Sequence, residues 1–473
     1  MTTISVRNPR TGETDAWITP PTGEELDVVA ARLRAAQGSW AGEGIEARMQ
    51  RLLRWADAMH ADLDKIAAAL EADTGRRRVA RLEVQGAVAS IRAWAASAPM
   101  LAPKADWLQG RSNPQLKHSG QFVPFGLVGV ISPWNFPLTL SLIDAIPALA
   151  AGSSVIVKPS EVTPRFVEPL ARTIELAGLS DLLAFTPGAG ETGQAVIERA
   201  DLICFTGSVP TGKKVAAAAA ERLIPAFLEL GGKDPMIITE TADLDLAVTA
   251  ALRGSVVSTG QACQSIERIY VARALHEVFL AKLIAGAEAV RLNWPSIEEG
   301  ELGPLIFDKQ AEIIAAQIED ARSKGAFIHT GGRIESHGGG RWIRPTVISN
   351  VDHSMSVMTE ETFGPVLPVM AFDTIEEAIR LANDTDYGLS AAVFAGTLGD
   401  AEAIARKLDA GAVSLNDAAL TALFYEAEKQ SFKASGLGPS RMGAAGLTRF
   451  FRRKALIANT GAPLPLEAFK EEG

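Results

Sequence analysis

The sequence is poor in cysteine and histidine. Only two cysteines, Cys204 and Cys263, and six histidines occur in 473 residues. Two cysteines cannot build a disulfide framework or a zinc site, so we expect no metal and a reducing compartment. The N-terminus lacks the basic-then-apolar plan of a signal peptide, and no apolar run reaches the roughly 18 residues of a membrane span. We therefore expect a cytoplasmic protein with no membrane partner.

A concentration of charge of one sign is also missing. The net charge of -10 is spread along the chain, and no Lys/Arg block is dense enough to follow nucleic-acid phosphates. The apolar fraction of 47% and the charged fraction of 22% are typical of a soluble globular protein. Because 473 residues exceed what one core normally supports, we expect two or three domains and no nucleic-acid partner.

Short β-rich runs alternate with helix-length segments over most of the chain. The predicted strands lie at 126–132, 154–159, 183–186, 202–206 and 226–230, and again at 268–271, 366–370 and 390–394. This alternation predicts an α/β fold with mostly parallel sheets covered on both faces. Ligands bind beyond the carboxyl ends of such strands. Asn135, Lys158, Ser208 and Glu229 stand at or just past predicted strand ends.

The two cysteines have different sequence surroundings. Cys263 lies among small and polar residues in Gly260–Ser265, whereas Cys204 lies in an apolar run. A reactive thiol needs access and polar help to form its thiolate, and a packing cysteine is enclosed by apolar groups. Cys263 is therefore the candidate nucleophile, although a lone cysteine is often an inert buried residue.

Two glycine-containing segments are candidates for phosphate binding. The segment 188–193 fits G-x-G-x-x-G, but it lacks the acidic residue that should follow, and a plain tight turn explains it equally well. The segment 205–213 is the better candidate. There a strand ends in Gly-Ser and a proline starts a helix, whose free N–H groups would face a pyrophosphate.

Two carboxylates follow predicted strands. Glu161 would accept from ribose hydroxyls and repel a 2′-phosphate, which favours NAD over NADP; a helix start is the alternative. Glu229 ends an apolar strand, where burial would raise its pKa toward that of a general base; an N-cap or an ion pair is the alternative.

Together these motifs occur in the order seen in the aldehyde dehydrogenase superfamily, which the chain resembles from about residue 20 to 455. The motifs are Asn135 within Pro133–Pro137, Lys158 with Glu161, Phe205–Gly212, Glu229–Lys233, Gly260–Cys263 and Glu361–Pro365. The resemblance implies two interleaved doubly wound αβα domains and a small β oligomerisation arm. Residues 1–106 and 126–232 would bind the dinucleotide, 233–430 would form the catalytic domain, and 107–125 with 431–473 would join the subunits of a homodimer or homotetramer.

The resemblance also implies site roles for oxidation of an aldehyde to the acid with NAD, or alternatively NADP. Cys263 would be the nucleophile, Asn135 and the Cys263 N–H would hold the oxyanion, and Glu229 would activate water. Lys158 and Glu161 would bind the adenosine ribose, Ser208 the pyrophosphate and Glu361 the nicotinamide ribose, with Phe363 beside the ring. Further cofactor contacts are expected at Ile131, Trp134, Gly190, Phe205 and Leu230.

One stretch departs from the family. Glu428–Gly436 keeps Lys433, Ser435 and Gly436, but lacks the family's Pro-Phe-Gly-Gly turn near the aldehyde entrance. By the resemblance, the entrance would be lined by Leu140, Ile143, Leu423, Phe424 and Tyr425. This lining predicts an apolar aliphatic or aromatic aldehyde.

Other interpretations stay open. Asp144 is expected at the surface or in a helix-packing contact. A CoA-acylating dehydrogenase, in which a thiol replaces water, is the alternative enzyme. A catalytically silent binding member of the family is the alternative from another class.

Overall fold

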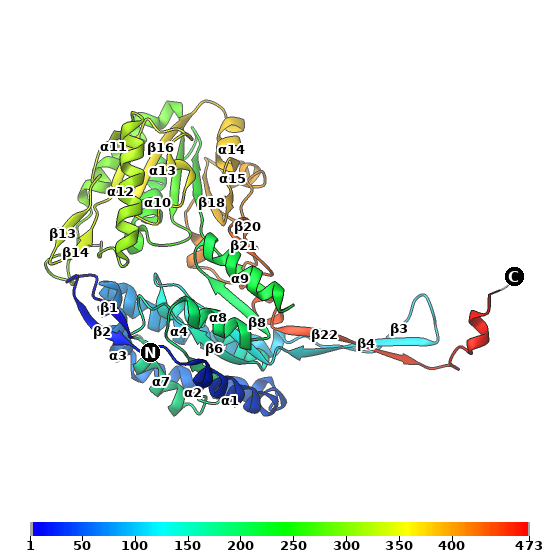
Figure 1. The fold of residues 1–473 in the computed structure, drawn as a ribbon. Helices are drawn as coiled ribbons and strands as arrows, with labels where there is room; N and C mark the ends of the chain where they lie inside the picture. The colour runs from blue at the N-terminus through cyan, green and yellow to red at the C-terminus, as the bar shows by residue number, and fades with distance from the viewer. Residues whose placement is uncertain (1–2, 472–473) are drawn as a thin grey trace.

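The computed structural model describes residues 3–471, which form a body built on two large sheets and a ribbon that leaves it (Figure 1). The first sheet has six strands in the order β21-β9-β8-β5-β6-β7. Their bounds are β5 (Leu127–Ile131), β6 (Ser154–Lys158), β7 (Leu183–Phe185), β8 (Leu202–Thr206), β9 (Ala226–Glu229) and β21 (Gly436–Leu437). Strands β5 to β9 are parallel, and only β21 is antiparallel. The carboxyl ends of the parallel strands therefore meet at one edge.

Alternating side chains of these strands enter two separate cores. Leu127 and Ile131 pack with α1, α8 and α9, whereas Val128 and Val130 pack with α2, α4, α6 and α16. The helix bounds are α1 (Gly23–Gly42), α2 (Ile45–Ala61), α4 (Arg77–Leu101), α6 (Ala145–Ala151), α8 (Gly190–Arg199), α9 (Val209–Glu221) and α16 (Ala445–Thr448). Helices α3 (Leu63–Thr74), α5 (Pro137–Leu142) and α7 (Val167–Leu176) complete this part. Because strand side chains alternate between faces, both faces of this sheet are apolar and covered.

The second sheet has seven strands in the order β12-β15-β16-β11-β10-β18-β19, and only β12 is antiparallel. The bounds are β10 (Asp234–Ile238), β11 (Ile266–Ala272), β12 (Phe327–Ile328), β15 (Thr346–Ser349), β16 (Val366–Phe372), β18 (Ser390–Phe394) and β19 (Ala412–Leu415). Helices α10 (Leu244–Val256) and α11 (Arg273–Ala289) cover one face. Helices α12 (Asp308–Ser323), α13 (Ser356–Thr359), α14 (Ile375–Asn383) and α15 (Leu398–Ala405) cover the other. Two parallel, helix-covered sheets confirm the predicted α/β class.

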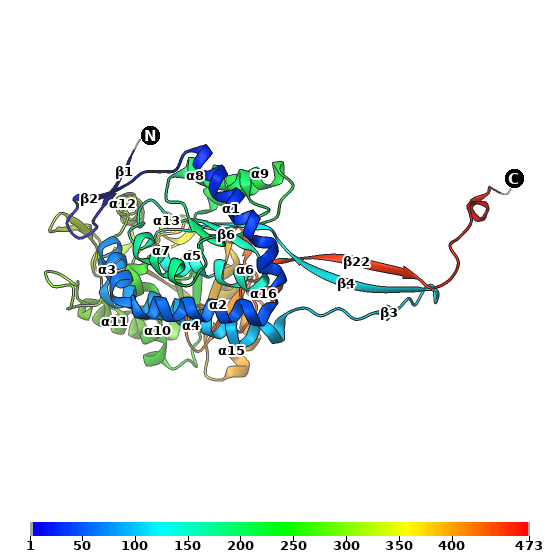
Figure 2. The same ribbon diagram turned by 90° about the horizontal axis from the view of Figure 1, so that it is seen from below.

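The ribbon consists of β4 (Leu116–Pro124) and β22 (Phe451–Asn459), with β3 (Leu108–Gln109) beside β4. Figures 1 and 2 show it extending well beyond the body, with the C-terminal segment at its tip. The main pairing of the ribbon is long-range, because β4 pairs along its whole length with a strand from the far end of the chain. We call β3, β4, β22 and residues 460–471 the arm.

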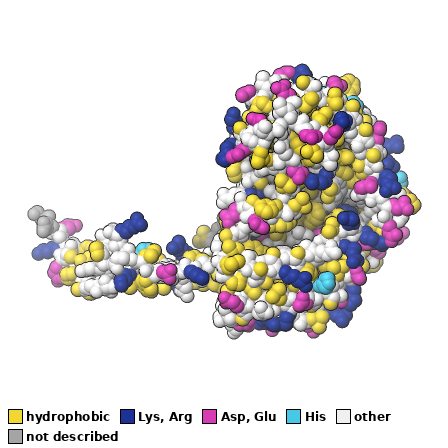
Figure 3. All heavy atoms as spheres, turned by 180° about the vertical axis from the view of Figure 1, so that it is seen from behind, with side chains coloured by type: hydrophobic (Ala, Val, Ile, Leu, Met, Phe, Trp, Pro, Cys, Tyr) yellow, Lys and Arg dark blue, Asp and Glu magenta, His cyan; other side chains and the backbone are white. Residues whose placement is uncertain are grey.

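Small elements connect these parts. They are the pairs β1 (Ile4–Arg7) with β2 (Thr14–Ile18), β13 (Glu335–His337) with β14 (Gly340–Trp342), and β17 (Tyr387–Gly388) with β20 (Phe432–Lys433). Through β20 and β21, residues 432–437 contact both halves of the body, so the predicted domain boundaries stay a prediction. On the face in Figure 3, basic and acidic side chains are interspersed. Among residues 3–471, no helix is long and apolar enough to cross a membrane.

Candidate active site

The polar residues predicted at strand ends do occupy the carboxyl edge of the first sheet. Lys158 is the last residue of β6, and Glu229 is the last residue of β9. Asn135 lies in the loop between β5 and α5, and Ser208 is the N-cap of α9. This edge faces the second half of the body, from which the Cys263 turn comes.

The Cys263 turn is preceded by a one-turn 3₁₀ helix, Val257–Gly260, with an unusual backbone. Ser258, Thr259 and Gly260 all have φ near +60°, which is costly for the two residues that carry a Cβ. A Cβ at Gly260 would lie 2.3 Å from the carbonyl carbon of Gly364. The turn is therefore packed directly against the loop that carries Glu361 and Phe363.

Asn135 is buried and reaches this turn. Its Nδ2 donates to the carbonyl oxygen of Gln261 at 3.0 Å, two residues before Cys263. Arg76, which sequence reasoning missed, donates to the carbonyl oxygens of both Asn135 and Ser258. Its buried guanidinium ties the Asn135 loop to the segment that leads into the cysteine.

Glu229 is held differently from the prediction. Its Oε2 accepts hydrogen bonds from Ser431 Oγ at 2.8 Å and from Lys429 Nζ at 3.2 Å, and Arg441 Nε lies 3.7 Å from its Oε1. Burial alone would raise the pKa of Glu229, but Arg441 and Lys429 outweigh it and hold this pKa below its usual range. The pKa of Glu229 is therefore shifted in the opposite direction to the prediction, because Glu229 forms ion pairs; its role as a general base stays a prediction.

The two thiols differ in access. Cys263 is half-buried, and Cys204, in the middle of β8, is fully buried in the core. Burial raises the pKa of Cys263 to about 12, with Lys429 as the main opposing charge. The expectation of a readily formed thiolate is therefore not met, because burial disfavours the charged form. Burial also raises the pKa of Cys204, whose Sγ lies 3.7 Å from a guanidinium nitrogen of Arg449.

Asp144, between α5 and α6, is buried in an ionic contact. It accepts from Arg449, and its second oxygen lies 3.6 Å from Arg441. The surface alternative for Asp144 is therefore wrong, and the packing alternative is correct. Because Arg441 also approaches Glu229, a row of alternating charges runs from Asp144 through Arg441 and Glu229 to Lys429. One hint of this row is visible in the sequence, namely the altered stretch Glu428–Gly436 that contains Lys429.

The residues predicted to bind a cofactor surround the ends of β6 and β8. Lys158 Nζ donates to Glu161 at 3.0 Å, and the Lys158 side chain is buried while that of Glu161 is partly exposed. Ser208 is exposed, and within the described part of the chain its side chain does not cap the first turn of α9. Gly190 begins α8, and among the described residues no atom lies within 4 Å of the position that a Cβ on this glycine would take. Ile131, Phe205 and Leu230 are buried in the core beneath.

This arrangement fits a dinucleotide. The free N–H groups and positive end of α9 suit a pyrophosphate. A Cβ at Gly212 in that helix would lie 2.5 Å from Leu230, so the glycine allows α9 to approach the strand edge closely.

Glu361 and Phe363 come from the second half of the body, and Trp134, from the loop after β5, meets Phe363. Glu361 Oε1 accepts from the Gly232 N–H at 3.1 Å, and burial with neighbouring Glu267 raises the pKa of Glu361 to about 8. The rings of Trp134 and Phe363 meet edge to face at 5.3 Å. The buried carboxylate of Glu267 accepts from the Phe363 N–H and from Lys233, and so holds this loop in place. Glu267 was not predicted.

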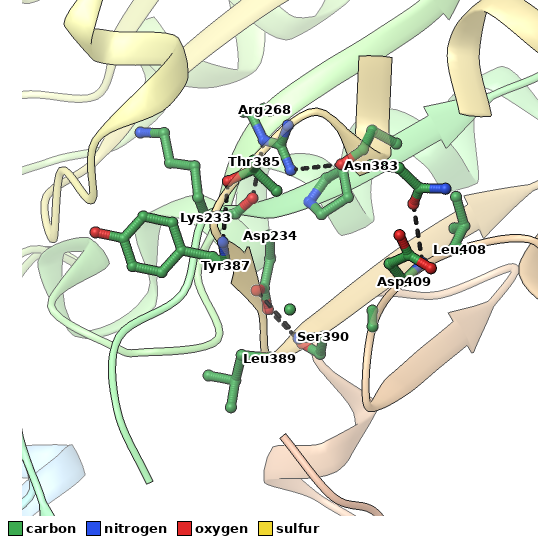
Figure 4. A pocket seen from close by; sticks show the side chains of 14 residues that line it. Lys233, Asp234, Arg268, Asn383, Thr385, Tyr387, Leu389, Ser390, Leu408 and Asp409 are labelled. Atoms are coloured by element: carbon green, nitrogen blue, oxygen red, sulfur yellow. Dashed lines mark hydrogen bonds between the residues drawn. The ribbon is translucent and has the colours of Figure 1, made fainter. Parts of the chain in front are cut away.

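A small pocket lies behind this loop, at the start of β10 (Figure 4). Figure 4 shows Asp234 pointing toward Ser390, with Lys233, Arg268 and Tyr387 nearby. None of the predicted catalytic residues lines it. Burial raises the pKa of Asp234 to about 7. We therefore do not assign the reaction centre to this pocket.

The residues predicted to line the aldehyde entrance lie on two segments. Leu140 and Ile143 are half-buried in and after α5, and Leu423, Phe424 and Tyr425 are exposed after the short 3₁₀ helix Leu420–Ala422. Their contact with a substrate stays a prediction.

Comparisons with known proteins agree on the family. The family model described as "Aldehyde dehydrogenase family" matches residues 1–456. A Mycolicibacterium smegmatis protein, named as a candidate succinate-semialdehyde dehydrogenase using NADP(+), is 39% identical over 94% of this chain and 88% of that protein. The structure of a candidate aldehyde dehydrogenase, PutA from Anabaena variabilis, matches with a TM-score of 0.95 and 52% identity over 98% of this chain and 99% of that one.

A Staphylococcus aureus betaine aldehyde dehydrogenase in complex with NAD+ matches with a TM-score of 0.91 and 32% identity, over 98% of this chain and 92% of that one. The sequence match, the parallel sheets and the shared architecture lead to one conclusion. This chain belongs to the aldehyde dehydrogenase family.

Proposed function

We propose that this chain oxidises an aldehyde to a carboxylic acid with NAD or NADP, through a thioester on Cys263. One observation carries the proposal: the Asn135 loop and the segment that follows Glu229 both contact the turn that contains Cys263. Asn135 donates to Gln261 within that turn. A Cβ at Gly232, three residues after Glu229, would lie 2.4 Å from the Cys263 carbonyl oxygen.

In this proposal Cys263 Sγ attacks the aldehyde carbon as its thiol proton passes to water, and the carbonyl oxygen becomes an alkoxide. The second N–H of the Asn135 amide and the backbone N–H of Cys263 stabilise this oxygen. Because burial raises the pKa of the thiol, proton removal has to accompany substrate and cofactor binding. When bound, the nicotinamide would supply the hydride acceptor that oxidation of this adduct to a thioester requires.

Glu229 acts in the second half of the reaction. As an ionised carboxylate it takes a proton from the water that attacks the thioester, which releases the acid and the thiol. Ser431 and Lys429 both donate to its Oε2, so its Oε1 is the oxygen that would take this proton.

The cofactor choice in this proposal follows from the Lys158–Glu161 pair. Relatives are named for NADP(+), and a structural neighbour holds NAD+. In this chain Lys158 ends β6 and Glu161 lies three residues beyond it; the Glu161 carboxylate would repel a 2′-phosphate, while Lys158 would attract one. We propose that NAD is the preferred cofactor and that NADP is used less efficiently.

The CoA-acylating alternative has one observation in its favour. The pKa of Glu229 is held low by two cations, and a carboxylate of low pKa is a weaker base for water. A thiol that attacks as a thiolate needs no such base. Activity that requires CoA would favour this alternative, whereas activity without CoA supports hydrolysis.

The direct test of the proposed function is a panel of aldehydes with NAD and NADP, followed by NADH or NADPH absorbance. The unmodified protein should turn over at least one aldehyde. Cys263→Ala should abolish turnover, while Cys204→Ala should retain most of it if the fold is preserved, because the Cys204 thiol is buried away from the site. Turnover by the Cys263→Ala protein would reject the assignment of the nucleophile.

A further inference from the structure

Two buried charged residues at the start of one helix hold the loop that carries Asn135. They are Arg76, the N-cap of α4, and Glu83, which lies within α4. Residues seven positions apart lie two turns along the same face of a helix. Both side chains are only 4% exposed. Helix α4 therefore carries a buried cation and a buried carboxylate on one face.

The contacts of these two side chains lie at the two ends of the segment from Asn135 to Thr139. Arg76 Nη2 donates to the carbonyl oxygen of Asn135. Glu83 Oε2 accepts from the N–H groups of Leu138 and Thr139 at 3.1 Å and 3.0 Å. The backbone that carries the Asn135 amide is therefore fixed at both ends by one helix.

Arg76 also contacts the cysteine turn. Its Nη1 donates to the carbonyl oxygen of Ser258 at 3.4 Å, in the segment with left-handed backbone before Cys263. Burial lowers the pKa of Arg76 only to about 10, so the guanidinium stays charged at neutral pH, and its planar fork can hold two carbonyls in a fixed geometry. Arg76 therefore joins the two backbone segments that carry the proposed oxyanion donors, the Asn135 amide and the Cys263 N–H.

The stability of the fold explains this pair of charges poorly. Among residues 3–471, Nε of Arg76 and Oε1 of Glu83 are buried and have no hydrogen-bond partner. Such atoms lose their water without compensation, and apolar residues of similar volume often stabilise a fold as well as a buried ionic pair does. The side-chain hydrogen bonds of the pair instead go to the segments that carry the reacting groups.

We propose that Arg76, supported by Glu83, is a positioning residue that sets the separation of the two oxyanion donors, an inference that rests on the proposed function. Arg76 contacts neither substrate nor cofactor, and it acts through Asn135. Its removal leaves the Cys263 thiol in place but lets the Asn135 amide move relative to that thiol. A displacement of about 1 Å in a catalytic group is enough to slow a reaction roughly 100-fold.

The test compares two reactions of the Cys263 thiol, both followed by mass spectrometry of its peptide. In acylation by 4-nitrophenyl acetate, Sγ bonds to the carbonyl carbon, the thiol proton passes to water, and 4-nitrophenolate leaves with the electron pair of its bond. This reaction passes through a tetrahedral oxyanion. Alkylation by iodoacetamide displaces iodide from a saturated carbon and forms no oxyanion. The ratio of the two rate constants therefore reports on the oxyanion donors, because access to the thiol and its thiolate fraction affect both reactions.

Arg76→Met should lower the ratio of acylation to alkylation by about tenfold or more, since a displaced oxyanion donor loses much of its effect. Arg78→Met, at an exposed position in the same helix, is the matched control and should keep the ratio of the unmodified protein. Asn135→Ala should lower the ratio at least as far as Arg76→Met does. The variant with both Arg76→Met and Asn135→Ala should fall no further than Asn135→Ala alone, because residues that act through one group are not additive.

A second variant keeps the test valid where Arg76→Met is unstable. Arg76→Met combined with Glu83→Met removes both buried charges and so leaves neither of them unpaired. Circular dichroism should show a folded protein, and the ratio should again fall about tenfold or more.

The outcomes separate this role of Arg76 from the proposed function. An unchanged ratio in both variants, or additive effects of Arg76→Met and Asn135→Ala, would overturn the positioning role and leave the proposed function standing. A Cys263 thiol that is alkylated but not acylated in the unmodified protein would also overturn it. Neither reagent needs NAD or hydride transfer, so absence of turnover with every aldehyde would reject the proposed function without altering this measurement.

Discussion

At the scale of single residues, the pKa of each carboxylate in the site depends on the charged side chain that it contacts. Glu229 and Lys429 are 200 positions apart in sequence and form a hydrogen bond. A local pattern can place Glu229 at a strand end, but it cannot supply this partner. The direction of the pKa shift of Glu229 therefore came out wrong, because burial was considered without the cations that outweigh it.

Glu161 is the residue that should decide the cofactor. We expect kcat/KM to be about tenfold or more higher with NAD than with NADP, because its carboxylate opposes a 2′-phosphate. Glu161→Gln should lower this ratio, since Lys158 then keeps its charge without its partner. Steady-state kinetics with both cofactors measures the ratio, with Glu168→Gln on the exposed side of α7 as the matched control. Equal efficiencies in the unmodified protein would show that Glu161 does not reach the ribose.

At the scale of elements, most strands could be predicted because buried parallel strands leave short apolar runs between glycines and prolines. Strands β5, β6, β8 and β9 lie where the sequence places them. The pairing of β4 with β22 could not be predicted, since it joins segments that are far apart and carry little apolar pattern. The position of Cys263 in a turn was predicted, but the left-handed backbone of Ser258 and Thr259 before it was not.

Asp234, the first residue of β10, should make the free energy of unfolding depend on pH. Burial raises the pKa of Asp234 to about 7, well above the unfolded value of about 3.9. Between these values the folded state holds more protons, so the free energy of unfolding should fall as pH rises from about 4 through 7. Asp234→Asn cannot ionise and should therefore lose less Tm between pH 5 and pH 8 than the unmodified protein.

Thermal unfolding followed by circular dichroism measures this difference. Asp386→Asn, at an exposed position in the same half of the body, serves as the control and should show the Tm change of the unmodified protein. The same loss of Tm in Asp234→Asn would mean that Asp234 is ionised throughout this range.

At the scale of the whole molecule, the arm exposes apolar side chains that the single chain does not cover. Ile457, Leu466 and Phe469 are 71%, 84% and 70% exposed. Exposed apolar area of this kind marks an association surface, and it supports the prediction of a homodimer or homotetramer. Figure 2 shows that the arm lies clear of its own body and so is free to meet a second chain.

Leu466→Asp together with Phe469→Asp should reduce the mass measured by light scattering. Glu467→Lys, between the two positions, should leave the mass unchanged. A monomeric unmodified protein, or an unchanged mass in the double variant, would remove this role of the arm.

The central claim is that Cys263 carries a thioester that Glu229 helps to hydrolyse. The most direct measurement is rapid mixing of Glu229→Gln with an accepted aldehyde and NAD, followed by mass spectrometry of the peptide that contains Cys263. The account predicts a burst of about one NADH per active site, an acyl group on Cys263, and a steady rate slower by about 100-fold, the scale of a lost general base. Glu198→Gln, on the exposed side of α8, should turn over like the unmodified protein. An unchanged steady rate in Glu229→Gln, or a burst without acyl-Cys263, would contradict the account.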